Sequence, residues 1–419
     1  MKTLIKKKID DPEQLENLYR SDKKEFEKSF FAVFPEIHTF PGARFWKARL
    51  DFEATKSAST GIKKAELLIL FIACAITGLL IELPKLFHMG IPETVFYQRN
   101  AGLITLFGLS LYSFMTKDSV KPKQVLFALF VFLASALYIN LLPVEATSDS
   151  ILLAYIHMPL MIWCLYGIIF IDFDIRSRAR RMEYLKYNGD LAILLAIIAI
   201  TGGILTAVTI GLFAAIEVQI EKFYMEYIVL VGLVSAPIVG TFIARTFPFV
   251  VNKIAPLIAS IFSPIVLITL IVYLVSIAVT GKDPYTNRDF LMVFNLMLLG
   301  VMAIIVFSVS ESPVNGKSRF SEFILFALSI VTMIIDLVAL SAIVYRLAEF
   351  GFTPNRIAVL GSNVLIFVHL ILIMLDLYRV NFKNKDIKQL EFTITNYLPV
   401  YALWTVLVVF VIPVLFGMK

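Results

Sequence analysis

Eleven long apolar runs constrain this chain more than any other feature of its sequence. They cover residues 65–83, 101–115, 124–142, 151–171, 190–216, 226–251, 254–280, 289–309, 322–345, 357–378 and 396–416. Most of them exceed the ~18 residues that a helix needs to cross a membrane core about 30 Å thick. They are continuously apolar and do not alternate with period two, which disfavours a membrane β-barrel. The runs therefore predict an all-α, polytopic transmembrane helix bundle of about 11 spans, of which the second is the shortest.

The composition excludes a soluble globular protein, a disordered chain and a collagen-like fibre. Hydrophobic residues make up 59% of the chain and charged residues only 17%, against about 25% charged in an ordinary soluble domain. Only two cysteines occur, Cys74 and Cys164, and both fall inside apolar runs. No disulfide framework, metal site or cofactor is therefore expected. Gly316-Lys317-Ser318 resembles the end of a P-loop, but the first glycine of that motif is replaced by Glu311. An ATP-driven pump and a nucleic-acid partner are not expected.

The positions of the charges predict the orientation in the membrane. With the N-terminus inside, 30 of the 38 Lys and Arg residues fall in inner segments and 8 in outer segments. The positive-inside rule favours this arrangement. The expected chain has its N-terminus inside and its C-terminus outside, in the inner (cytoplasmic) membrane of a cell. The inner face carries a net charge of +9 and the outer face −2. Asp336 is the one charged residue assigned to the interior of the membrane.

Residues 1–64 predict a cytoplasmic, amphipathic helical segment that precedes the transmembrane domain of residues 65–419. Asp11 and Gln14 have the spacing of a helix cap, with Pro12 at the first helical position. Basic residues in this segment favour contact with anionic lipid headgroups at the inner face. The segment either lies against the inner ends of the spans or binds a cytoplasmic protein partner.

Small residues recur at every fourth position in two consecutive spans. Such ladders allow helix backbones to approach closely inside a bilayer. They predict that the fifth and sixth spans pack tightly against each other or other spans, or form the seam of a homodimer. The steps of the ladders are Gly203, Ala207 and Gly211 in the fifth span and Gly232, Ala236 and Gly240 in the sixth, with Ala199, Ala215 and Ala244 continuing them.

The strongest candidate site lies in the ninth and tenth spans. Asp336 lies 14 residues into a span of 24, too deep for its carboxyl to reach water easily. Counting back from a turn near Gly351 places it within one helical turn of His369. Ser329, Thr332 and Ser362 share these two helix faces. An acid and an imidazole in a medium of low dielectric can exchange a proton or bind a cation, and they can also form a buried pair that only fixes helix packing.

Other ionisable residues are expected at the surfaces of the membrane. Arg245 and Asp376 each lie 19 residues into a span, at the inner interface, where they can form a structural pair. Asp172 and Asp174 have the DxD spelling of metal-binding transferases, although acids at a helix end are usually solvated.

The stretch Arg346-Leu-Ala-Glu-Phe-Gly-Phe-Thr-Pro-Asn-Arg-Ile-Ala-Val-Leu-Gly-Ser-Asn363 is the most distinctive in the chain. Together with Gly281-Lys-Asp-Pro-Tyr285, it resembles the bacterial membrane-protein family catalogued as domain of unknown function 4153. The resemblance covers most of the membrane portion and implies a bacterial inner-membrane protein. It carries over no catalytic residues. Within the stretch, Thr353 is expected to cap the tenth span, with Pro354 at the first position.

Three classes of function agree with these features. Eleven spans, little soluble mass and the prolines at 237, 248, 256 and 264 favour a permease or an ion- or proton-coupled carrier, in which Asp336 and His369 handle the proton or cation. No convincing inverted repeat accompanies them. A scaffold or sensor would bind its partner through residues 1–60. A membrane enzyme acting on a lipid-linked substrate would use Glu82, His88 and Glu93; an enzyme is the less favoured class.

Overall fold

The computed structural model describes residues 1–59, 64–87, 92–143, 148–214, 218–247, 261–275, 279, 285, 288–310, 319–383 and 385–418. Every regular element among them is helical, as the apolar runs predicted. The chain divides into two compact units, Met1–Leu67 and Leu68–Lys419. Each unit is described by itself below.

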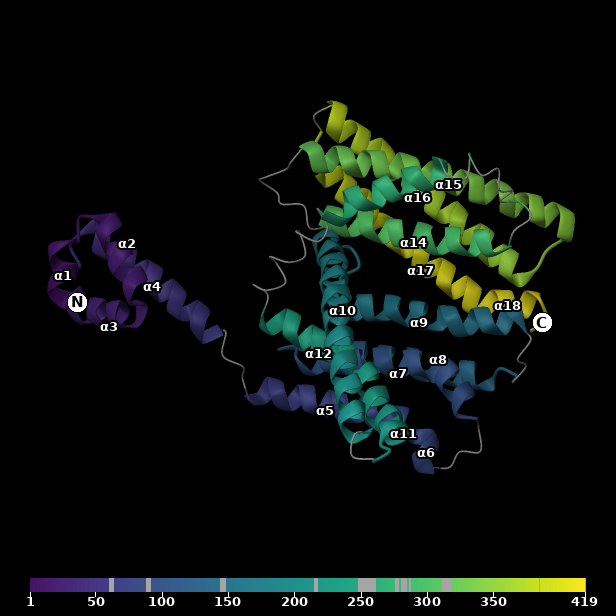
Figure 1. Ribbon diagram of the computed structural model, residues 1–419, viewed down its shortest axis with the longest axis horizontal. Helices are drawn as coiled ribbons and strands as arrows, with labels where there is room; N and C mark the ends of the chain where they lie inside the picture. Colours follow the sequence, from purple (N-terminus) through teal and green to yellow (C-terminus); the bar gives the residue numbers. More distant parts are fainter. Residues whose placement is uncertain are drawn as a thin grey trace. The chain divides into compact units, whose positions relative to one another are not determined.

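The first unit contains four helices around a core of its own (Figure 1). The helices are α1 (Lys2–Lys7), α2 (Pro12–Ser21), α3 (Lys23–Ile37) and α4 (Pro41–Ser59). The predicted cap is confirmed, because the Asp11 carboxylate accepts the backbone N–H of Gln14 at 3.1 Å. Asp22 has an extended backbone and caps α3, so the helical pattern is divided there into two helices. Large side chains from all four helices fill the core, namely Ile5, Leu15, Tyr19, Phe26, Phe30, Trp46 and Leu50.

Eight helices of the described chain are long and apolar enough to cross a membrane. They are Lys64–Ile81, Pro122–Leu141, Asp149–Phe170, Arg178–Gly211, Glu221–Thr246, Phe320–Phe350, Pro354–Lys383 and Lys388–Leu415. The other three predicted runs coincide with the more polar helix α7 (Glu93–Met115) and with two shorter apolar helices, Ile261–Val275 and Phe294–Ser310. The structure therefore shows a multi-pass helical character, and the total of eleven spans stays a prediction.

The labelled helices that contain the eight membrane-length segments are α5 (Lys64–Ile81), α8 (Pro122–Leu141), α9 (Asp149–Phe170), α10 (Arg178–Ala214), α12 (Leu230–Thr246), α15 (Arg319–Phe350), α16 (Pro354–Lys383) and α17 (Lys388–Val406). The shorter apolar helix Phe294–Ser310 belongs to α14 (Arg288–Ser310). Short elements complete the described chain: α6 (Leu83–Phe87), α11 (Glu221–Phe223), α18 (Ile412–Leu415) and the π-helical segments η1 (Tyr224–Val229) and η2 (Leu407–Val411).

The second unit has its largest apolar core where α14, α15, α16 and α17 lie side by side (Figure 1). The 32-residue α15 and the 30-residue α16 are antiparallel neighbours joined by a short turn. Gly351 takes a φ of +75° in this turn, a conformation that favours glycine. The expected start of α16 is confirmed, since the Thr353 hydroxyl accepts the backbone N–H of Arg356. This pairing brings the middle of α15 against the middle of α16.

Helix α10 runs across the direction of α9 (Figure 1). Its 37 residues extend about 56 Å at 1.5 Å per residue, well beyond the ~30 Å hydrocarbon core of a bilayer. Its apolar window is only 11% buried within the chain. Helix α10 therefore has far less protein around it than α9, whose window is 50% buried.

Helices α10 and α12 contact each other, but most steps of their small-residue ladders do not lie in that contact. The homodimer seam stays a prediction. In α10, Gly203, Ala207 and Gly211 are all exposed, and a Cβ placed on either glycine would meet no atom within 4 Å. In α12, Gly232 is exposed in the same way, whereas Ala236 is half-buried. Only Gly240 meets α10, and it does so at the large side chains of Leu191, Leu194 and Ile198. The two helices thus pack by inserting α10 leucines over one glycine of α12. Ala215 lies outside the described residues.

Three prolines lie inside or directly after described helical segments. Pro237 lies inside α12 and Pro264 inside Ile261–Val275, whereas residues 248 and 256 lie outside the described residues. Pro413 follows η2 and removes the N–H that would bond to the carbonyl of Val409 in a regular α-helix. The hydroxyl of Tyr138 on α8 donates to that carbonyl at 2.8 Å. The irregular turn is therefore tied to a neighbouring helix.

Candidate functional site

Asp336 lies at the middle of α15 and is completely enclosed by protein. Its exposed fraction is 0%, and its neighbours in sequence, Ile335 and Ala339, belong to the core shared by α14, α15, α16 and α17. Within the described chain, neither carboxyl oxygen of Asp336 has a hydrogen-bond partner. A buried polar group without a partner costs free energy, and a buried charge costs much more. Such a group in the middle of a bundle requires an explanation.

His369 lies on α16 and is held by two tyrosines of α17. It is 1% exposed, and its Nδ1 is 3.0 Å from the hydroxyl of Tyr401. Its ring stacks on Tyr397 with centroids 4.2 Å apart and planes inclined by 15°. The Nε2 atom has no hydrogen-bond partner in the described chain. The imidazole is therefore fixed in orientation while one of its nitrogens is left open.

The structure places Asp336 and His369 in one core, but no hydrogen bond joins them in the described part of the chain. Ile335 and Ala339 of α15 and Ile366 and Leu370 of α16 all contribute to that core. The hydroxyl of Tyr401 contacts His369, and Tyr401 itself packs against the same core.

The predicted hydroxyl residues are placed around this core and already have partners. Ser329 and Thr332 are fully buried, and each donates at 2.7 Å to a carbonyl of its own helix, Phe326 and Leu328 respectively. Ser362 is half-buried and accepts from the indole N–H of Trp404 at 2.9 Å. The protons of Ser329 and Thr332 are used, but the lone pairs of these two hydroxyls stay available to a bound proton donor or cation.

Arg245 and Asp376 do not form the expected pair. Arg245 donates instead to the hydroxyl and the carbonyl of Thr116 at the end of α7. Asp376 is 4% exposed and accepts from Arg379 at 2.9 Å and from the Thr393 hydroxyl at 2.5 Å. Equal depth in the membrane did not make these residues neighbours, because each had a nearer partner.

Asp172 has a structural role at the end of α9. Its carboxylate binds Lys117 at 2.5 Å and Arg180 at 2.7 Å, and its backbone has a φ of 55°. Burial raises the pKa of Asp172, but the two cations outweigh this effect, and its pKa lies below the ordinary value. Both oxygens are occupied, so the DxD spelling does not present a free ligand pair. Among the described residues, no group of three or more His, Cys, Asp or Glu side chains is arranged to hold a metal ion.

The acids considered for an enzyme lie directly after α5 and at the start of α7. Glu82 is 7% exposed, and its carboxylate lies 3.2 Å from the ammonium of Lys85. Lys85 also donates to the backbone carbonyl of Glu226 in η1 at 3.1 Å. Glu93 begins α7, and His88 lies outside the described residues. Lys85 therefore ties α6 to η1 through the Glu226 carbonyl.

Sequence reasoning missed a belt of hydroxyl groups that joins four helices. Tyr166 of α9 donates to Tyr187 of α10 at 2.9 Å, and Tyr187 lies 2.7 Å from the hydroxyl of Thr241 on α12. Ser113 of α7 lies 3.3 Å from Tyr166. Scattered tyrosines, serines and threonines in apolar runs were the available signal, but their pairing depends on helix neighbours that are far apart in sequence.

A buried arginine was also missed. Arg99 of α7 is 6% exposed and donates to the carbonyls of Asn140 and Leu142 at 3.0 and 2.7 Å and to the hydroxyl of Tyr155 at 3.0 Å. These carbonyls end α8, where a helix leaves its last acceptors unpaired. Arg99 therefore closes the end of one helix from another.

Comparisons with protein-family models, with curated proteins and with solved structures found no match. The resemblance to family 4153 accordingly stays a prediction. The case for a function depends on the geometry described above.

Proposed function

We propose that this multi-pass membrane protein is a permease or an ion-coupled carrier in which Asp336 takes up and releases a proton or a small cation. The proposal includes the bacterial inner membrane as its location, with the N-terminus inside. One observation carries it: a carboxyl group that is 0% exposed and has no hydrogen-bond partner in the described chain.

The energetic argument starts from the cost of that carboxyl. An unpaired carboxylate in a low-dielectric core is strongly disfavoured, so the group must be neutral or must hold a cation. A residue that served only to fix packing would be better replaced by an apolar side chain of similar volume. The retention of an acid in this core is therefore explained by a species that arrives and leaves.

The surroundings of Asp336 provide a place to which a proton can move. His369 has an open Nε2 in the same core, and Tyr401 is hydrogen-bonded to its Nδ1. The described conformation encloses Asp336 and His369, which corresponds to an occluded state of a carrier. Access from either side then requires a movement of α15 relative to α16 and α17.

The test uses the full-length protein in vesicles. Proton movement is followed with an internal pH indicator under an imposed membrane potential, and the state of the carboxyl is followed by infrared difference spectroscopy. We expect Asp336→Asn to reduce the flux to that of empty vesicles and to remove one carboxylic-acid C=O band. Glu349→Gln, on an exposed position of the same helix, is the matched control and should change neither. Wild-type flux and an intact band in Asp336→Asn would sink the proposal.

A second candidate function is favoured by the structure of the first unit. Residues 1–59 contain a complete apolar core, while Leu4, Phe31, Phe40 and Phe45 stay exposed, the last at 64%. A scaffold or sensor would bind a cytoplasmic protein through this surface. Crosslinking would recover one defined protein with the wild type and lose it with Phe45→Ser, whereas Asp336→Asn would keep it.

A further inference from the structure

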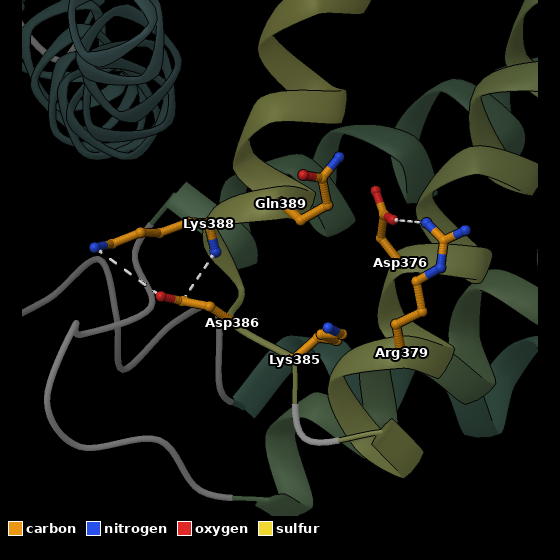
Figure 2. A pocket seen from close by; sticks show the side chains of 6 residues that line it. All are labelled: Asp376, Arg379, Lys385, Asp386, Lys388 and Gln389. Atoms are coloured by element: carbon orange, nitrogen blue, oxygen red, sulfur yellow. Dashed lines mark hydrogen bonds and ion pairs between the residues drawn. The ribbon is translucent and has the colours of Figure 1, made fainter.

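The ends of α16 and α17 enclose a cavity of about 480 Å³ at the surface of the helix bundle (Figure 2). Its lining consists of Asp376, Arg379, Lys385, Asp386, Lys388 and Gln389. The volume lies within the range of small-molecule sites, about 300–1,000 Å³. Three of the lining side chains are basic and two are acidic, so the lining has a net positive charge.

The acids of the cavity are already neutralised by the protein. Both oxygens of the buried Asp376 are occupied, one by Arg379 and one by Thr393. Asp386 accepts the backbone N–H of Lys388 at 3.1 Å, and its other oxygen lies 4.0 Å from the Lys388 ammonium (Figure 2). Asp376 therefore offers little repulsion to an incoming anion, whereas the exposed Asp386 is only loosely paired with Lys388.

The basic groups keep donors for a ligand. Arg379 is 52% exposed, and its bond to Asp376 uses one of five N–H donors. In the described part of the chain, the Lys385 ammonium has no ion-pair partner, and Lys388 is 74% exposed. A guanidinium and two ammonium groups around one cavity are the usual recognition set for a phosphate group.

Further cations lie along the same face of α17. Arg178 of α10 lies over the ring of Phe392 at 3.8 Å, and Arg181 donates to Asn396 at 2.9 Å. Phe392 and Asn396 follow Lys388 by one and two helical turns, so these positions share one side of the helix. The positive charge of the cavity is therefore continued by a second basic group.

Exposed apolar side chains lie on α16 next to the lining residues, and two of them, Tyr378 and Phe382, also contact Phe326 of α15. Leu375, Tyr378 and Phe382 are exposed by 41%, 43% and 57%, and their spacing places them on the stripe beside Asp376 and Arg379. The rings of Tyr378 and Phe382 lie 5.2 Å apart. Aromatic residues of this kind are typical of the membrane–water interface. A ligand with a charged phosphate and apolar chains matches both parts of this surface.

We propose that this cavity binds the phosphate headgroup of an anionic phospholipid. Arg379 and Lys385 contact the phosphate oxygens, Lys388 and the neighbouring arginines supply the surrounding positive charge, and the acyl chains follow the exposed stripe of α16. The site is separate from the Asp336 core and does not depend on the carrier mechanism or on which side of the membrane it faces.

The test is native mass spectrometry of the detergent-solubilised full chain, titrated with phosphatidylglycerol and, for comparison, with zwitterionic phosphatidylcholine. The double variant Lys385→Gln/Lys388→Gln removes two cations and keeps the Arg379–Asp376 pair, so the fold is preserved. The matched control is Lys121→Gln/Lys123→Gln, which removes the same charge at exposed positions beside α8. A thermal melt verifies that both variants fold.

The wild type should retain phosphatidylglycerol in preference to phosphatidylcholine. Since each basic residue near a membrane contributes about 1 kcal/mol to anionic-lipid binding, the loss of two should weaken binding about thirtyfold. The control variant should bind like the wild type. Equal loss in both variants would show diffuse charge attraction and overturn the proposal. Displacement of the lipid by inorganic phosphate at similar concentrations would assign the cavity to a soluble anion and would also overturn it.

Discussion

At the scale of single residues, Asp172 shows how a surface acid acquires a structural role. Lys117 comes from the end of α7 and Arg180 from the start of α10, so its carboxylate links three helices. Half of the side chain is exposed, and solvent weakens such ion pairs to about 1 kcal/mol or less. We expect Asp172→Asn to lower the thermal stability slightly at pH 7, measured in detergent, while Asp118→Asn on the same surface leaves it unchanged.

The pH dependence of that difference follows from the lowered pKa of Asp172. A group whose pKa is lower in the folded state stabilises the fold above its unfolded value, here an ordinary value of 3.8, and this contribution is lost as pH falls through the folded value. The melting difference between the wild type and Asp172→Asn should therefore be constant near neutrality and disappear in acid below pH ~4. A difference that grew on acidification would contradict the assigned ion pairs.

Arg99 provides a stronger test at the residue scale. Its guanidinium holds two carbonyls at the end of α8 and a hydroxyl of α9. A lysine keeps the charge but cannot donate in these directions at once. Arg99→Lys should cost about 2 kcal/mol, because buried carbonyls lose their donors. Lys123→Arg, at an exposed position, is the comparison and should be neutral.

At the scale of helices, Tyr138 and Pro413 should act as a unit. Proline removes an N–H from the last helix, and the tyrosine hydroxyl serves the carbonyl of Val409. We expect Tyr138→Phe to cost about 1 kcal/mol in the wild type, the usual net value of one hydrogen bond. In a Pro413→Ala background, the restored N–H can serve that carbonyl, and the same change should cost less. Additive effects in this double-mutant cycle would refute the coupling.

The comparison of prediction with structure is also clearest for helices. Apolar runs and cap residues such as Asp11 and Thr353 are local signals, and the structure confirms the helix starts they predicted. Asp336 and His369 could be placed at one level because their helices are joined by a short turn. Tyr397 and Tyr401 were missed because α17 packs beside His369 through a contact that the turn does not determine.

The missing Arg245–Asp376 pair and the exposure of the small-residue ladders have the same origin. Depth along a helix can be counted from sequence, whereas the direction in which a helix faces its neighbours cannot. Arg245 and Asp376 share a depth but meet Thr116 and Arg379 instead. Gly203 and Gly232 lie on the ladders, yet both face away from the neighbouring helices of this chain.

At the scale of the whole molecule, the orientation depends on whether α10 carries the chain from one side of the membrane to the other. The charge distribution predicts that it does, with residues 117–121 inside and residues 218–220 outside. Figure 1 shows α10 running across α9, and a helix that lay along the surface would leave both segments on one side. The same change would reverse the predicted location of every later segment and place both chain ends on one side.

Cysteine labelling in intact cells tests this directly. Asp118→Cys and Gln219→Cys are introduced singly into a chain in which Cys74 and Cys164 are replaced by alanine. Both positions are exposed in the structure, so each thiol is open to reagent on its own side. A membrane-impermeant maleimide should label Gln219→Cys and should label Asp118→Cys only after the cells are opened. Equal labelling of both in intact or only in opened cells would show that an even number of α8, α9 and α10 cross; if α8 and α9 both cross, α10 does not. The predicted total of eleven spans would then have to fall by one, because the positive-inside bias downstream of α10 would have been assigned to the wrong face.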